Sequence, residues 1–241
     1  MALPKIDSPV YEMDLPLSKK HIRFRPFLVK EQRNLMMAME SDDKETIEKN
    51  IKQVLHNCTL TTDVNIDTLP IIDVEFYFLN LRARSVGEVI ESKYRCENEV
   101  NDKACGNLMD TSINLLDIKV QMNENAKDVI QLNDTIAIKL KYPEFSLLDT
   151  ATKFDSATEM AFQMIVESIE YIYDGEQYYY PNETDPTELV EFVESLNAEQ
   201  FAKIEEFFNN LPVLNKTINT TCGKCGYNHT IEVEGLDNFF G

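Results

Sequence analysis

Apolar residues recur three and four positions apart in three segments near the start of the chain, which is the spacing of one helix face. Leu28 to Met39 carries a stripe of Leu and Met that we expect to face the core, with a docking surface that repacks around a partner as the alternative. The pattern Asp42-x-x-Glu45 predicts the capped start of a second helix that ends near Cys58. Ile71 to Arg82 is apolar on almost every side, so we expect it at the centre of an N-terminal helical core. The stripe of the first helix consists of Leu28, Leu35, Met36 and Met39.

Alternation of apolar and polar residues predicts strands elsewhere. Residues 1–17 contain three prolines and form an extended arm, in which Val10 to Leu15 is expected to pair as an edge strand. His21 to Phe27 alternates as the next strand, with His21 at the surface. Gln131 to Tyr142 is predicted to be one continuous strand, whereas Asp117 to Asn125 is polar and is expected to be a connection.

A hairpin is predicted over Tyr171 to Tyr178, because Asp174-Gly175 supplies the turn between two aromatic arms. The tyrosines Tyr178, Tyr179 and Tyr180 allow two interpretations. They pack across the hairpin, which we favour, or they form an exposed anchor for a partner.

Capping signals predict three further helices, which begin after Ser156, Asp185 and Asn197. The first is expected to bury Met160, Ala161, Met164, Ile165 and Ile169. The next two are expected to bury Leu189, Phe192, Val193 and Leu196, and then Phe201, Ile204, Phe207, Phe208 and Leu211.

Two segments far apart in the chain resemble one another: each has a strand, a cysteine turn closed by Cys-Gly, and a second strand. A Cys-x-x-Cys-Gly turn supplies two thiolates from one tight loop, and its glycine can turn the chain away from a metal ion. The first turn departs from the usual spacing by an insertion, Glu97 to Ala104. Facing each other, the segments would supply four ligands for a structural zinc ion: Cys96, Cys105, Cys222 and Cys225.

Other roles for these residues stay open, and the main alternative is that the four cysteines are a relic of a family metal site that no longer binds an ion. Cys222 and Cys225 could form a redox pair, although a thioredoxin-like motif opens a helix and here a strand follows. A disulfide would need an oxidising compartment, and Met1 to Val10 has no apolar segment of a secretory signal. Cys58 is expected to be a buried small residue. His229 could replace one ligand, but we favour a solvent-exposed position on a strand.

The composition is that of a soluble globular protein without a membrane span, with 27% charged and 43% hydrophobic residues among 241. The net charge of −19 disfavours nucleic acid as a partner. The charge is uneven: between Asp155 and Asn210, fourteen acidic residues face Lys203 alone, whereas Lys19 to Arg33 is basic. The acidic stretch is a solvated face, or else it meets a basic partner or a second copy, so a homo-oligomer is among the expected assemblies.

Four groups of residues carry a resemblance to a known family. They are Arg25-Pro26-Phe27-Leu28-Val29-Lys30-Glu31; Phe78-Leu79-Asn80-Leu81-Arg82 with Ser85-Val86-Gly87-Glu88; Glu194-Ser195-Leu196-Asn197 with Glu199-Gln200-Phe201; and Cys222-x-x-Cys225-Gly226 with Glu234-Gly235-Leu236. The order and spacing of these groups make the chain resemble the baseplate hub subunits of T-even-type contractile-tailed phages. It most resembles the versions carried by marine and cyanobacterial myoviruses.

The resemblance implies a hub assembly protein that acts on other baseplate hub proteins and on the tape-measure protein. It would work in the host cytoplasm during assembly, and the alternative is a permanent hub subunit in the tail baseplate of the virion. It implies no catalytic residues, and the chain shows no phosphate-binding loop, nucleophile elbow or His-Glu-x-x-His motif. We therefore expect a protein that is not an enzyme. A zinc-ribbon adaptor outside phages is a more distant alternative.

The predicted fold is α+β, with helical segments flanking a small antiparallel sheet and a two-knuckle element like a zinc ribbon. We expect five segments along the chain. They are an arm and first strand (1–27), a helical segment (28–86), the first cysteine knuckle (87–118), a strand with helices and the tyrosine hairpin (119–212), and the second knuckle packed on the first (213–241).

Overall fold

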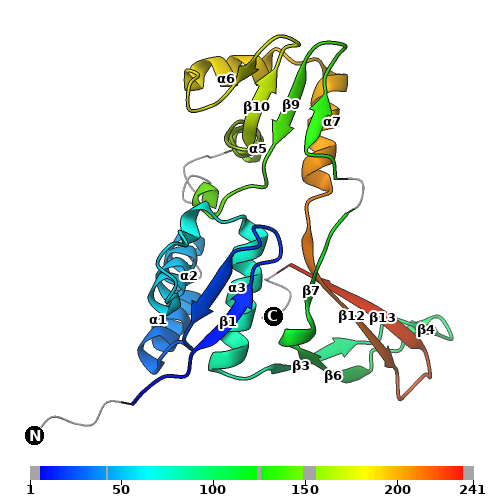
Figure 1. Ribbon diagram of the computed structural model, residues 1–241. Helices are drawn as coiled ribbons and strands as arrows, with labels where there is room; N and C mark the ends of the chain where they lie inside the picture. Colours follow the sequence, from blue (N-terminus) through cyan, green and yellow to red (C-terminus); the bar gives the residue numbers. More distant parts are fainter. Residues whose placement is uncertain (1–5, 42, 124–125, 149–155, 236–241) are drawn as a thin grey trace, which may run out of the picture. The chain divides into compact units, whose positions relative to one another are not determined.

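The computed structural model describes residues 6–41, 43–123, 126–148 and 156–235. It contains helices and small antiparallel sheets, as predicted for the α+β class (Figure 1). The chain divides into two compact units. The first comprises Met1–Val64, Ile72–Gln121 and Val213–Gly241, and the second comprises Asn65–Ile71 and Met122–Pro212.

Three helices and a two-stranded sheet form one part of the first unit. The sheet pairs β1 (Tyr11–Asp14) with β2 (His21–Phe24), and the helices are α1 (Val29–Glu40), α2 (Lys44–Cys58) and α3 (Ile71–Ser85). The predicted central position of α3 is confirmed, because eight of its residues are buried. Its Tyr77 ring lies edge-on to Phe24 of β2, with ring centroids 5.4 Å apart.

The methionine stripe of α1 was predicted wrongly. Met36 and Met39 are 55% and 59% exposed, and α1 instead buries Glu31 and Ala38. The two buried residues lie seven positions apart on one face of the helix, and Glu31 forms a buried ion pair with Arg25 there. The start of α2 also differs, because Asp43 accepts the Thr46 backbone N–H as the cap, and Asp42 lies outside the described residues.

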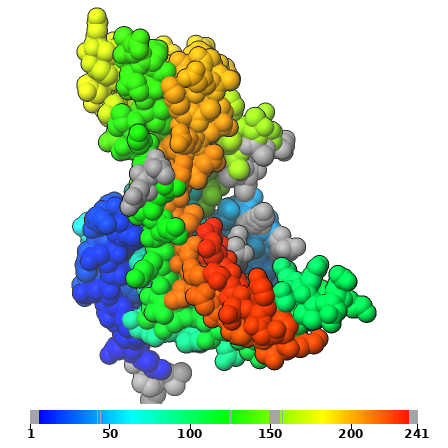
Figure 2. All heavy atoms as spheres, turned by 90° about the vertical axis from the view of Figure 1, so that its right-hand side faces the viewer, coloured from blue at the N-terminus to red at the C-terminus, as the bar shows by residue number. Residues whose placement is uncertain are grey.

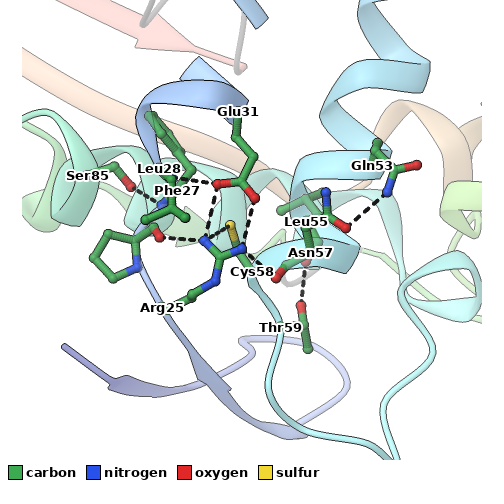
Figure 3. A network of polar contacts seen from close by, with 11 residues as sticks. Arg25, Phe27, Leu28, Glu31, Gln53, Leu55, Asn57, Cys58, Thr59 and Ser85 are labelled. Carbon is green, nitrogen blue, oxygen red and sulfur yellow. Dashed lines mark hydrogen bonds and ion pairs between the residues drawn. The ribbon is translucent and has the colours of Figure 1, made fainter. Parts of the chain in front are cut away.

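The ion pair joins Arg25, just after β2, to Glu31 in the first turn of α1 (Figure 3). The guanidinium donates to both carboxylate oxygens, at 2.8 and 3.2 Å, and to the backbone oxygens of Pro26 and Asn57. The Glu31 carboxylate also accepts the backbone N–H of Leu28. A second buried carboxylate, Asp73 of α3, accepts the backbone N–H groups of Leu17 and Ser18. Polar contacts therefore attach the arm and the first helix to the rest of this part.

Two hairpins form the other part of the first unit. Strand β3 (Val89–Arg95) pairs with β6 (Leu108–Asn114), and β12 (Val213–Thr221) pairs with β13 (Asn228–Glu234). A 3-10 turn, η2 (Leu115–Asp117), follows β6. The hairpins share a core with α3 that includes Ile113, Leu115, Leu214 and Val233.

The segment expected to be a polar connection contains a strand, β7 (Lys119–Gln121), which pairs with β12. Its central residue, Val120, lies opposite Leu214 and packs against the shared core. The segment does alternate, with apolar Ile118, Val120 and Met122 separated by Lys119 and Gln121, and this local signal of a strand was overlooked. The edge that β7 pairs with is supplied by β12, more than ninety residues later.

The second unit contains a four-stranded antiparallel sheet in the order β11-β10-β9-β8. The strand predicted over Gln131 to Tyr142 is instead a hairpin of β8 (Val129–Gln131) and β9 (Ala137–Leu140). Asn133 makes the turn, because its side-chain oxygen accepts the backbone N–H groups of Thr135 and Ile136. The tyrosine hairpin is confirmed as β10 (Ile169–Tyr173) and β11 (Tyr178–Tyr179).

The tyrosines pack across that hairpin, as favoured. Tyr178 lies 5.1 Å from Tyr171 and 4.7 Å from Tyr173, measured between ring centroids. Tyr178 nevertheless remains 53% exposed, so the packed rings still form a surface feature.

The helices of the second unit are α5 (Ala157–Glu167), α6 (Pro186–Glu194) and α7 (Ala198–Asn209), with 3-10 turns η1 (Ile66–Thr68) and η3 (Phe145–Leu147). Their predicted starts are confirmed. Asn197 and Gln200 form a reciprocal capping box, whereas Ser156 and Asp185 each accept the backbone N–H two positions later.

Helices and sheet of this unit enclose a core that includes Ile138, Ile165, Val193, Ile204 and Phe207. Two residues predicted for the buried face of α5 lie elsewhere: Met160 is 41% exposed, and Ile169 belongs to β10. Phe162 and Val166 pack on the core from α5.

The insertion between Cys96 and Cys105 contains two short strands, β4 (Glu99–Val100) and β5 (Lys103–Ala104), which pair with each other. No helix among the described residues combines the length and apolar character needed to cross a membrane.

Candidate metal centre

The two look-alike hairpins bring four cysteines together. Strand β3 leads into Cys96 and β6 follows Cys105, while β12 leads into Cys222 and β13 follows Cys225. The four Sγ atoms all lie within 4.8 Å of one another, with Cys96 to Cys225 at 3.6 Å and Cys105 to Cys222 at 3.8 Å. Figure 2 shows the second knuckle, coloured orange to red, beside the blue-green insertion of the first.

The two turns are built in the same way. The N–H of Gly106 donates to the Cys96 oxygen at 3.0 Å, and the N–H of Gly226 donates to the Cys222 oxygen at 2.8 Å. Both glycines have positive φ, +65° and +74°, which an L side chain rarely adopts. The first cysteine of each turn also donates its backbone N–H to the backbone oxygen of the residue two positions after the second cysteine. Cys96 donates to Asn107, and Cys222 donates to Tyr227. The predicted knuckle pattern is thus present in both halves.

The insertion leaves this geometry intact because it folds on itself. β4 and β5 pair through a tight turn in which Asn101 and Asp102 adopt positive φ, 52° and 59°. The Cys105 N–H then donates to the Asn98 oxygen at 2.8 Å, which closes the insertion at its base. The eight residues extend outward as a small hairpin, and the two cysteines return to the same relative place as in a short turn.

The spacing of the sulfur atoms fits one tetrahedral metal ion. Four ligands at about 2.3 Å from a zinc ion place neighbouring sulfurs about 3.8 Å apart, close to the Cys96–Cys225 and Cys105–Cys222 Sγ distances. A disulfide requires about 2.05 Å between sulfurs, and all four cysteines are free thiols. Cys96 and Cys222 are fully buried, whereas Cys105 and Cys225 are partly exposed. The cluster is therefore compatible with a bound metal.

Side chains around the cluster donate to the sulfurs. The Asn98 amide lies 3.7 Å from the Cys225 Sγ, and the Asn107 amide lies 3.5 Å from the Cys222 Sγ. Each asparagine follows a first-knuckle cysteine by two positions and reaches a cysteine of the other knuckle. The Lys224 ammonium donates to the Cys105 backbone oxygen at 3.1 Å. Sequence reasoning missed these residues, although the repeated Cys-x-Asn spacing was a usable signal.

His229 does not occupy the solvent-exposed position that we favoured. It is half-buried on β13, and its Nε2 lies 3.1 Å from the Cys96 Sγ. The ring also meets Tyr227, with centroids 4.8 Å apart. The alternation of β13 did not reveal this contact because Cys96 lies on another hairpin.

Hydrogen bonding and burial act in opposite directions on two of the thiols. The backbone N–H groups of Cys225 and Lys224 lower the pKa of Cys222 to about 6, because they stabilise its thiolate. Burial raises the pKa of Cys96 to about 12. Of these two neighbouring thiols, Cys222 is therefore the more readily ionised, and ionised thiols are the form that binds metals.

We expect His229→Ala to weaken metal binding by roughly 10- to 100-fold, the usual effect of losing a group that contacts a ligand. The measurement is competition with a chromogenic chelator, and Thr230→Ala on the same strand is the matched control. Equal affinities for the two variants would show that the His229 contact does not support the cluster.

The remaining chemistry-bearing residues lie elsewhere. Cys58 is fully buried, as predicted, next to the Arg25 guanidinium at 3.6 Å. Burial raises its pKa to about 12, so it stays an unreactive thiol. His21 is at the surface, as expected, and contacts Asp14 and Glu12. The turn of Cys222 and Cys225 leads into strand β13 rather than a helix, which disfavours the redox interpretation.

Comparisons with known proteins place the chain in a family. It is 26% identical over 231 residues to the baseplate hub assembly protein gp26 of Enterobacteria phage T4, covering 95% of this chain and 97% of that protein. No solved structure matches it. The family model of the T4 bacteriophage base plate protein matches residues 8–241. The chain therefore belongs to the T4 bacteriophage base plate protein family.

Proposed function

We propose that this protein assists the assembly of the baseplate hub of a contractile-tailed phage. The observation that carries the proposal is the extent of its similarity to the T4 hub assembly protein, which spans 97% of that relative. The matched residues, 8–241, include both cysteine knuckles and all of the two units except the first seven residues. A role that needs the whole chain is thus supported better than one that needs a single shared module.

The role is one of binding rather than catalysis. Its partners are other baseplate hub proteins and the tape-measure protein, met in the host cytoplasm while the tail is built. The described residues supply surfaces for such contacts, among them the exposed tyrosines of β11 and the acidic helices of the second unit.

Within this role, the four cysteines hold a structural zinc ion. Four thiolates with tetrahedral spacing suit zinc or iron, and zinc is the usual occupant of two facing knuckles. Cys105 and Cys222 lie 117 positions apart, so the ion would join the middle of the chain to its C-terminal part. It supplies no reaction chemistry, and its binding would add directly to folding stability.

Mass spectrometry of purified phage particles and of infected-cell lysate tests the assembly role. We expect the protein to be abundant in lysate and absent from finished particles, and loss of the gene to leave particles without tails. Complementation by the intact gene is the control. Normal tail formation without the gene would contradict the proposed function.

The alternative within the same family is a permanent hub subunit. It predicts a fixed ratio of this protein to other baseplate proteins in purified particles. The same mass-spectrometry data separate the two, since an assembly factor has no constant copy number in the particle.

A further inference from the structure

An apolar groove of about 550 Å³ lies on the second unit, between helices α5 and α6. The two helices, which pack against each other, are labelled in Figure 1. Phe162 and Val166 line it from α5, and Val190 and Val193 line it from α6. Phe201, at the start of α7, stacks on Phe162 at 5.2 Å between ring centroids and closes the floor. Val190 is 36% exposed, so part of this apolar lining is open to solvent.

The rim of the groove is acidic. Glu159 of α5 and Glu194 of α6 line it, and both are exposed. Within the described part of the chain, neither carboxylate forms an ion pair with a Lys or Arg. The surrounding stretch from Asp155 to Asn210 holds fourteen acidic residues and Lys203, and Lys203 pairs with Glu199. An occupant of this groove therefore gains from positive charge at its edges.

The walls of the groove also restrict the backbone of the occupant. All lining residues belong to α5, α6, α7 and the short connection around Leu196, and no strand edge is among them. An extended peptide would find no backbone groups to pair with, whereas a helix satisfies its own. Two helices side by side also accept a third in the groove between them.

We propose that this groove binds an amphipathic helix of another protein, with an apolar stripe against the phenylalanines and valines and Lys or Arg beside Glu159 and Glu194. The inference rests on the proposed function only for the origin of that helix, a protein of the hub assembly pathway. Helix binding to the groove is measured with purified components, so a negative result there would not contradict the proposed assembly role.

The probe is a labelled helical peptide of about fourteen residues, roughly 21 Å long, with Leu at positions i, i+3, i+4 and i+7 and Lys on both flanks. Fluorescence anisotropy with the full chain is expected to show saturable binding. The same peptide with Glu in place of Lys is expected to bind at least about tenfold more weakly, because attraction at two sites becomes repulsion.

Two charge-matched variants locate the contact. Glu159→Lys with Glu194→Lys is expected to reduce affinity for the Lys-flanked peptide about tenfold. Glu176→Lys with Glu205→Lys changes the net charge equally but lies outside the groove lining, and it is expected to change affinity less than about twofold. Val190→Ser, at a partly exposed position, is expected to weaken both peptides alike. Circular dichroism confirms that each variant is folded.

Three outcomes would overturn the proposal. The first is no saturable binding of the Lys-flanked peptide, and the second is equal weakening by the rim and control variants, which would indicate general charge attraction. The third is a dimer of the purified chain that the rim variants dissociate. A second copy would then occupy the groove, for example through the exposed apolar side chains of α1, instead of a partner helix.

Discussion

Replacing Cys222 with Ser should abolish stoichiometric metal binding and destabilise the facing hairpins. Structural zinc sites in small domains contribute on the order of 10 kcal/mol to folding at neutral pH. Even half of that loss lowers the unfolding temperature of a chain of this size by roughly 10–20 °C. The effect is large because Cys222 is fully buried, accepts an N–H from Asn107, and links strands separated by more than a hundred positions. Elemental analysis and thermal unfolding measure the two consequences.

The fifth cysteine provides the matched control. Cys58→Ala removes a buried thiol far from the cluster in sequence, and we expect it to retain the metal and to cost about 1 kcal/mol. Wild-type protein treated with a chelator should unfold like the Cys222→Ser variant. A Cys222→Ser protein that keeps one metal ion per chain and its full thermal stability would refute the zinc proposal.

Glu31→Gln should reduce the free energy of unfolding by about 3 kcal/mol, since it leaves the Arg25 charge without its partner. The Arg25 side chain is 19% exposed and that of Glu31 is 3% exposed, so water compensates only part of the lost pair. The substitution also weakens the acceptor for the Leu28 N–H at the start of α1. Chemical denaturation of the variant and the wild type measures the difference.

The same substitution at an exposed ion pair is the control. Glu88→Gln removes the partner of Arg84, whose side chain is 35% exposed, and we expect a cost below about 0.5 kcal/mol. Similar costs at both sites would mean that the buried pair has no special role.

The Glu31 contribution should also depend on pH. Burial opposes ionisation of Glu31, but hydrogen bonds from Arg25 and Leu28 outweigh it and hold its pKa below the ordinary value of 4.5. A depressed folded-state pKa adds stability that is complete above the unfolded-state value and is lost as the pH falls through the folded-state value. The gap between wild type and Glu31→Gln should therefore be constant near neutral pH and shrink below about pH 4.5. A gap that widens in acid would contradict this assignment.

The local sequence determined most elements of the fold. Helices begin after Ser156, Asp185 and Asn197 because these side chains accept backbone N–H groups two or three positions later. Such a cap involves only residues that are neighbours in the chain. The tyrosine hairpin follows in the same way from Asp174-Gly175. The cysteine repeat predicted the two equivalent turns, because each turn requires only its own thiols and a glycine with positive φ.

The tertiary structure decided what depends on contacts between distant residues. Strand β7 pairs with β12 across more than ninety positions, and the buried face of α1 carries Glu31, which pairs with Arg25, while Met36 and Met39 stay exposed. His229 meets Cys96 across 133 positions, a contact that no local pattern contains. Periodicity reports which face of an element is apolar, whereas the partner of that face is set by packing between segments that the chain order does not bring together.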